Sequence, residues 1–279
     1  MAAANTHKRR SSIYIIISIF LILTAFIVVF PYVLMLFTSF RTTKEILSHP
    51  NEILPIVWTT ANYIKVFTKS PFVKWFINSL TITVSVTAAV LFTSTITGYV
   101  FAKYKFKYKE TLFLIILATM MVPSQVTMIP SFLIINWIGL YNKLSSLIVP
   151  GLISTFGIYL CKQFIEDIPD SLCESAVIDG ANDFTIYSRI IVPQIRPAIG
   201  ALTIFTFLGT WNDYLGPLIM LSEVDKMTLP LALSFFNSQH STDIGATMAA
   251  ATLVMMPVTI VFIAFQKQFI KGVSLTGLK

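Results

Sequence analysis

The chain has 279 residues, of which 55% are hydrophobic and 12% are charged, and its mean hydropathy is +0.77. This composition excludes a soluble globular domain and indicates a polytopic membrane protein. The net charge of +7 does not indicate nucleic-acid binding, because the basic residues stand in short runs beside apolar segments. The two cysteines, Cys161 and Cys173, form no C-x-x-C pair, so neither a disulfide nor a metal site is indicated.

Six apolar segments are long enough to cross a membrane as helices. We expect spans at residues 13–37, 76–102, 111–135, 144–164, 197–221 and 244–266. The first is a retained span, since its apolar core is too long for a signal peptide and has no small-residue cleavage site. Most of the 20 basic residues fall on the side that holds both chain ends, which predicts cytoplasmic termini. The fold class is therefore all-α, a single transmembrane domain over residues 1–279.

Two of the connecting segments have a distinctive composition. Residues 41–74 are turn-rich, with three prolines, and predict an external loop with short amphipathic pieces. Residues 103–109 alternate lysines with aromatic residues and predict a hairpin at the cytoplasmic interface of the membrane.

Polar groups inside the second and third spans have two interpretations. Residues 76–102 contain many serines and threonines, which favour close helix packing with hydroxyls bonded to their own backbone, or else line an aqueous path. The third span contains Pro123 and Pro130 with Gln125 between them, so we expect its helix to be broken in the outer half.

One acidic residue, Asp213, lies inside the fifth span, where an ionised group is costly and marks a transport path or a buried pair. Its neighbours Trp211, Asn212 and Tyr214 offer flat apolar faces and polar edges that suit a sugar. The alternative is a structural hydrogen bond for Asp213, with the aromatic residues as interfacial anchors. These four residues and Gln125 are candidates for a substrate path.

The longest polar interval in the second half of the chain is the loop at residues 170–193. Ser171 and Glu174 have the spacing of a capping box, which predicts a helix start at Ser171. Gly180 can adopt the left-handed conformation that ends this helix. Asn182 or Asp183 then caps a second helix from Phe184 to Ile191, which Pro193 ends. Two short helices about a glycine, between two spans, predict a docking element on the cytoplasmic side.

The same loop resembles the signature of ABC importer permeases, E-A-A, three residues, G, nine residues, I-x-L-P. The matching residues are Glu174, Ser175, Ala176, Gly180, Ile190, Val192 and Pro193, with Ser for one Ala and Val for the Leu. Further stretches at residues 61–64, 78–80, 210–214 and 269–272 are similar to the carbohydrate-uptake branch, and the chain as a whole looks like its MalG type.

The resemblance implies one permease subunit of a binding-protein-dependent sugar importer in a bacterial-type inner membrane. Its partners would be a MalF-like second permease, two copies of an ABC ATPase subunit and an extracytoplasmic sugar-binding protein, with ATP and Mg on the ATPase. This chain contains no P-loop sequence, so we expect no cofactor and no enzymatic activity of its own. The implied contacts to the ATPase are the tail residues Lys271 and Gly272 and the loop residues Glu174, Ser175, Ala176, Asp179, Gly180, Phe184, Tyr187, Arg189 and Pro193.

Two alternatives share much of this pattern. An ABC permease for a non-sugar solute would have the same coupling loop. An ion-coupled secondary transporter would instead need paired half-helices with ionisable groups near the midplane, and internal repeats. Whether this chain or the second permease holds the sugar within the membrane is open, with family precedent favouring the second permease.

Overall fold

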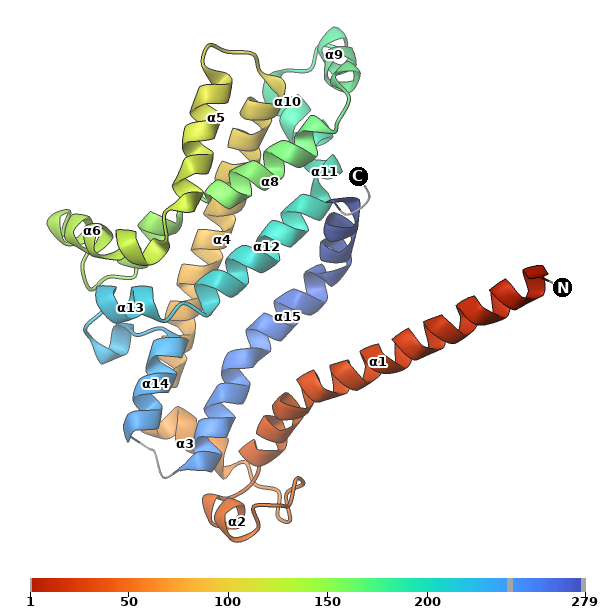
Figure 1. Cartoon of the computed structure of the whole chain (residues 1–279). Helices are drawn as coiled ribbons and strands as arrows, with labels where there is room; N and C mark the ends of the chain where they lie inside the picture. The colour runs from red at the N-terminus through yellow and green to blue at the C-terminus, as the bar shows by residue number, and fades with distance from the viewer. Residues whose placement is uncertain (1, 240–242, 277–279) are drawn as a thin grey trace. The chain divides into compact units, whose positions relative to one another are not determined.

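The computed structural model describes residues 2–239 and 243–276, and the side chains of residues 14–234 and 243–268. Every regular element in these residues is helical, which confirms the all-α prediction (Figure 1). The helices fall into two compact units, Met1–Ser70 with Phe236–Leu253 and Pro71–Phe235 with Val254–Lys279.

The first unit contains α1 (Ala2–Ser39), α2 (Thr43–Ser48), α3 (Ala61–Lys69) and the beginning of α15 (Ile244–Thr276). The side chains of α1 described from Tyr14 onward are mostly exposed apolar groups. The segment after α1 is held by Arg41, which is buried and donates to the carbonyls of His49 and Glu52 at 2.7 and 2.5 Å. Residues 41–74, where short amphipathic pieces are expected, contain the two short helices α2 and α3.

The second unit is built around α4 (Phe72–Lys103), which packs along α8 (Thr155–Glu166) and α12 (Arg196–Trp211) (Figure 1). Small residues allow this close approach, as in other membrane helix pairs. A Cβ atom at Gly98 would lie 2.8 Å from the Cβ of Cys161 and 2.9 Å from the backbone nitrogen of Lys162. The core consists of aliphatic side chains of these helices, including Ile82, Val90 and Leu202.

The remaining elements of this unit are short. They are α5 (Lys109–Ala118), η1 (Thr119–Met121), α6 (Ser124–Trp137), α7 (Ser145–Ile148), η2 (Val149–Gly151), α9 (Asp170–Ile178), α10 (Asp183–Ile186), η3 (Tyr187–Ile191), α11 (Val192–Gln194), α13 (Leu215–Met220), η4 (Val224–Lys226) and α14 (Leu229–Gln239), whose last residues belong to the first unit.

Four continuous segments of the described chain are long and apolar enough to cross a membrane, at Tyr14–Ser39, Phe72–Lys103, Ser145–Glu166 and Ile244–Gln268. Two further candidates are bent pairs, Lys109–Met121 with Ser124–Trp137 at 100° and Asp183–Gln194 with Arg196–Trp211 at 77°. The first bend lies at Pro123 and confirms the broken third segment. The described chain thus offers four to six spans.

The fifth predicted span, residues 197–221, is wrong as one continuous helix. The helix α12 ends at Trp211, and a separate α13 begins at Leu215. Between the two helices, Oδ1 of Asp213 accepts a hydrogen bond from the N–H of Gly216 at 3.2 Å, so this side chain bonds to the local backbone at the break.

Candidate functional site

The loop of residues 170–194 is fastened to α4 at its first residue. Nζ of Lys103, at the end of α4, donates to the carbonyl of Ile168 at 2.5 Å and to Oδ1 of Asp170 at 2.6 Å. The side chain of Lys103 is only 9% exposed, whereas that of Asp170 is 76% exposed. This hydrogen-bonded ammonium holds the pKa of Asp170 below its usual value.

The predicted capping box at the start of α9 is wrong. The helix begins at Asp170, one residue earlier, after Pro169, and no side chain caps it. The carbonyl of Ser171 accepts a hydrogen bond from the hydroxyl of Ser175 at 2.8 Å, as in a helix interior. The fixed backbone of Pro169 sets the entry angle of the chain, which explains why the helix starts before Ser171.

The turn between the two short helices forms as its residues predict. Gly180 has φ +84°, in the left-handed region, and the N–H of Ala181 donates to the carbonyl of Ala176 at 2.9 Å. The side-chain oxygen of Asn182 accepts from the N–H of Thr185 at 2.8 Å and caps α10. The angle between α9 and α10 is therefore set by one glycine and one cap.

The second short helix is predicted to end at Pro193, but it extends beyond that residue. It continues through the π-helical turn η3 to Gln194, and the 77° bend follows at Ile195. A π turn shifts the backbone hydrogen-bond pattern just before the proline, so the missing N–H of Pro193 is accommodated in the first turn of α11.

The loop has one face against the unit's own core and one face free of it. Cys173, Ala176 and Tyr187 pack against the core formed with α4, and the hydroxyl of Tyr187 lies 2.8 Å from Oγ1 of Thr95. On the other face, Phe184 is 70% exposed and Ile178 is 86% exposed.

The remaining predicted coupling residues can be placed as well. Glu174, Ser175, Asp179 and Arg189 are exposed, and Pro193 is half-buried. Burial raises the pKa of the Cys173 thiol and of the nearby Tyr104 phenol, whose partner Asp183 acts in the same direction. Lys271 and Gly272 lie within α15, but their side chains are outside the described set.

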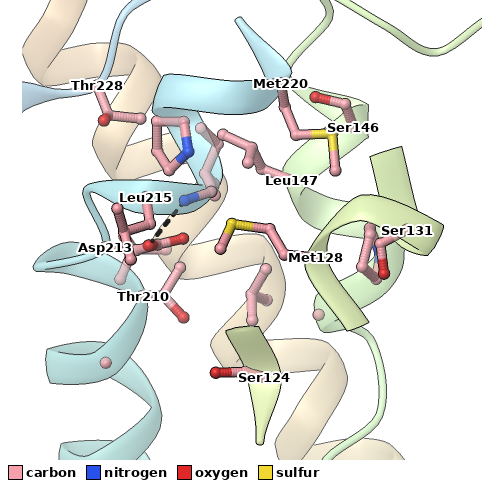
Figure 2. A pocket seen from close by; sticks show the side chains of 18 of the residues that line it. Ser124, Met128, Ser131, Ser146, Leu147, Thr210, Asp213, Leu215, Met220 and Thr228 are labelled. Atoms are coloured by element: carbon pink, nitrogen blue, oxygen red, sulfur yellow. Dashed lines mark hydrogen bonds between the residues drawn. The ribbon is translucent and has the colours of Figure 1, made fainter. Parts of the chain in front are cut away.

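A second feature is a cavity of about 520 Å³ within the larger unit, bounded by α4, α6, the α7–η2 segment and the α12–α13 junction. In Figure 2 the carboxylate of Asp213 and the side chain of Met128 approach its middle from opposite sides. Its polar lining is Ser79, Thr83, Ser124, Gln125, Thr127, Ser131, Ser146, Thr210, Asp213 and Thr228.

The cavity brings together only two of the five predicted path residues, Gln125 and Asp213. Trp211 is 1% exposed, stacks on Phe207 at 5.7 Å and donates from Nε1 to the carbonyl of Val254 at 3.1 Å. Asn212 and Tyr214 are exposed and do not line the cavity. The indole of Trp211 thus fills the core beside the cavity.

Two residues that the sequence did not single out individually are Thr83 and Thr228. Both are buried, both line the cavity, and neither hydroxyl has a hydrogen-bond partner in the described structure. Thr83 belongs to a helix that is rich in serine and threonine, but Thr228 stands in a loop with no such signal. Other hydroxyls of α4 bond to their own backbone as predicted, for example that of Thr95 to the carbonyl of Leu91 at 2.7 Å.

Comparisons with known proteins give a consistent result. A family described as binding-protein-dependent transport system inner membrane component matches residues 94–275. The arabinooligosaccharides transport system permease protein AraQ of Bacillus subtilis (strain 168) is 33% identical, over 98% of this chain and 99% of its own. The diacetylchitobiose uptake system permease protein NgcG of Streptomyces coelicolor is 32% identical, over 98% and 90%.

Two further likenesses extend this result. The lactose transport system permease protein LacG of Rhizobium radiobacter is 32% identical, over 90% of this chain and 91% of its own. A crystal structure of a bacterial ABC transporter involved in the import of the acidic polysaccharide alginate has a chain that matches with a TM-score of 0.80 at 23% identity, over 91% of this chain and 95% of that one. At this identity the structural match shows the fold alone.

Proposed function

Because the chain belongs to the family of binding-protein-dependent transport system inner membrane components, we propose that it is one permease subunit of an ATP-driven sugar importer in a bacterial-type inner membrane. The relatives are named for arabinooligosaccharides, diacetylchitobiose and lactose, which favours di- or oligosaccharides as cargo. The assembly would include a MalF-like second permease, two ATPase subunits that bind ATP and Mg, and an extracytoplasmic sugar-binding protein.

The observation that supports coupling through the loop is that one of its faces packs against the chain and the other is exposed. One face is fixed to α4 by Lys103 and Tyr187, and the other presents Ile178 and Phe184 to solvent. Exposed large apolar side chains on a short, capped element are typical of an interface. We assign this face, with the exposed carboxylates of Glu174 and Asp179, to contact with the ATPase.

The anchoring of the loop suggests how movement reaches the membrane part of the chain. A displacement of α9 would act on α4 through the Lys103 and Tyr187 contacts, and a displacement of α10 would act on α12 across the bend at Ile195. Binding of a partner to the loop can shift a conformational equilibrium only through contacts that differ between the two states. The loop is the surface on which such contacts would form.

The experiment that tests coupling is Gly180→Val in the complete importer, reconstituted in proteoliposomes. The φ of +84° at this position is strongly unfavourable for a β-branched residue, although nothing lies within 4 Å of a Cβ atom there. We expect sugar uptake to fall about tenfold or more while ATP hydrolysis continues and the permease remains folded.

The matched control is Gly180→Asn, because asparagine tolerates the left-handed conformation better than other residues with a side chain. This variant should keep most of its uptake. Wild-type uptake by Gly180→Val would show that the angle between α9 and α10 does not matter for coupling.

A further inference from the structure

Two buried hydroxyls at the cavity lack hydrogen bonds. Thr83 is 1% exposed and Thr228 is 5% exposed, and Oγ1 of each has no partner in the described structure. Threonine in a helix commonly bonds to a carbonyl of the preceding turn, as Thr95 does. Helix geometry therefore does not by itself explain why the Thr83 hydroxyl has no hydrogen bond. A buried polar group without a partner calls for a ligand or a water that is not part of the chain.

The charge of the cavity is set by one residue. Asp213 is the only residue with a charged side chain among those that the structure places at the cavity wall. Its Oδ1 is engaged by the N–H of Gly216, and a Cβ atom at position 216 would lie 2.4 Å from Oδ2, so a glycine there keeps room for the carboxylate. Hydrogen-bond acceptors and a negative charge face the cavity without a compensating cation in its wall.

We propose that this chain itself holds one ring of a neutral sugar in this cavity, with Thr83, Thr228 and Asp213 bonding to sugar hydroxyls. The inference rests on the proposed function, because it takes the cargo to be a sugar. It departs from the expectation that the second permease holds the sugar, and it excludes uronic acids, whose carboxylate would face that of Asp213.

The dimensions and chemistry of the wall agree with such an occupant. A volume of about 520 Å³ lies within the range of small-molecule pockets, which is about 300–1,000 Å³. Hydroxyls both donate and accept, and apolar groups such as Met128 and Leu147 alternate with them around the wall. A sugar ring has the same combination of hydroxyl edges and apolar C–H faces.

The test is binding of defined sugars to the full chain in lipid nanodiscs, measured by saturation-transfer NMR. The neutral probes are arabinotriose, diacetylchitobiose and lactose, and the acidic probe is digalacturonate. We expect saturation transfer to at least one neutral probe and none to digalacturonate. Thr83→Val should weaken neutral binding by about fivefold or more, because it removes a hydroxyl while keeping the shape of the side chain.

Thr87→Val is the matched control. Thr87 lies one turn further along α4, is buried and also has an unpartnered hydroxyl, but it does not line the cavity, so its loss should change binding less than twofold. Asp213→Asn should allow digalacturonate to bind. Absence of neutral binding, or equal effects of the two threonine variants, would mean that the cavity holds water only and would overturn the inference.

Failure of the proposed function has a different signature. If the full chain does not co-purify with an ATPase subunit, and no sugar stimulates ATP hydrolysis in the assembled complex, the importer assignment is lost. Sugar-stimulated hydrolysis in a complex whose permease shows no binding in the cavity would instead remove only the present inference.

Discussion

The buried hydroxyls of α4 are not all satisfied in the same way along the helix. Near the end that meets the loop, Lys103 and Thr95 bond to the loop, and Thr93 donates to the carbonyl of Leu152 at 3.0 Å. In the other half, Thr83 and Thr87 are also buried but have no partner, whereas Ser79, near the start of the helix, accepts from the N–H of Leu229 at 2.7 Å. Ser94 is an exception within the bonded half, since its hydroxyl lies against Gly157 without a hydrogen bond.

The difference between bonded and unpartnered polar side chains indicates two roles for a single helix. The side chains that bond to the loop hold this half of α4 and the loop in one arrangement. Of the two unpartnered hydroxyls, only that of Thr83 lines the cavity, where a polar ligand would offset the cost of leaving it without a hydrogen bond. Both properties belong to the one helix that contacts the loop and also lines the cavity.

The largest effect should come from breaking the packing that holds the bonded half in place. Gly98→Leu would place its side chain against the backbone of α8, where even a Cβ atom comes within 2.9 Å of the nitrogen of Lys162. We expect a loss of about 3 kcal/mol or more in stability, or no folded protein, measured by thermal unfolding in detergent.

Gly209→Ala is the control for this packing prediction, since nothing lies within 4 Å of a Cβ atom at that position. It should unfold within a few degrees of the wild type. Equal stability of Gly98→Leu and the wild type would show that α4 and α8 can separate at little cost.

The next effect concerns the anchor of the loop. Lys103→Met keeps the buried aliphatic stem but removes the donor to Ile168 and Asp170. Amide hydrogen exchange in α9 should increase by about tenfold, because this end of the helix loses its link to α4. Lys107→Met, at an exposed position in the same connection, should leave exchange in α9 unchanged. An unchanged rate in Lys103→Met would assign the anchoring to the apolar contacts of Cys173 and Ala176.

Two smaller effects, both on stability, should differ between the two halves of α4. Thr95→Val removes the hydrogen-bond partner of Tyr187 and should cost about 1 kcal/mol, since the partly buried Tyr187 hydroxyl is then left without that bond. Thr87→Val removes a buried hydroxyl that has no partner, so its stability should equal or exceed that of the wild type. Chemical unfolding in detergent measures both, and an equal loss in the two variants would remove the distinction between the halves.

The features that could be predicted from sequence are those decided within a few residues. The left-handed Gly180, the cap at Asn182 and the break at Pro123 each follow from the covalent structure of one side chain. The start of α9 does not follow from the spacing of Ser171 and Glu174, because the helix begins directly after the fixed backbone of Pro169. The family signature identified the loop independently of these local details.

The features that could not be predicted depend on residues far apart in the chain. Lys103 and Asp170 are separated by 67 positions, and nothing in their local sequence indicates that they meet. Trp211 and Asp213 are neighbours in sequence, yet one is packed in the core and the other lines the cavity, because the helix ends between them. Local patterns therefore identified the loop but only part of the cavity.

The smallest expected effect is the pH dependence of the loop anchor. The pKa of Asp170 is depressed below its ordinary value of 3.8 by the hydrogen bond from Lys103, so the pair stabilises the anchor at pH values above 3.8 and is lost as the pH falls through the depressed pKa. Lys103 still donates to the carbonyl of Ile168 after Asp170 is protonated, which keeps the change small.

Spin labels at positions 107 and 178, in a Cys173→Ser background, would report this change as a broader distance distribution between pH 5 and pH 3. Asp170→Asn should show the broad distribution at pH 5 already and little further change on acidification, because it lacks the titrating carboxylate. A wild-type distribution that broadens well above pH 5 would show that a group other than Asp170 controls the order of the anchor. The residual order at low pH measures how much of the anchor is held by the carbonyl contact of Ile168 and by the packing of Ala176 and Tyr187, without the Asp170 pair.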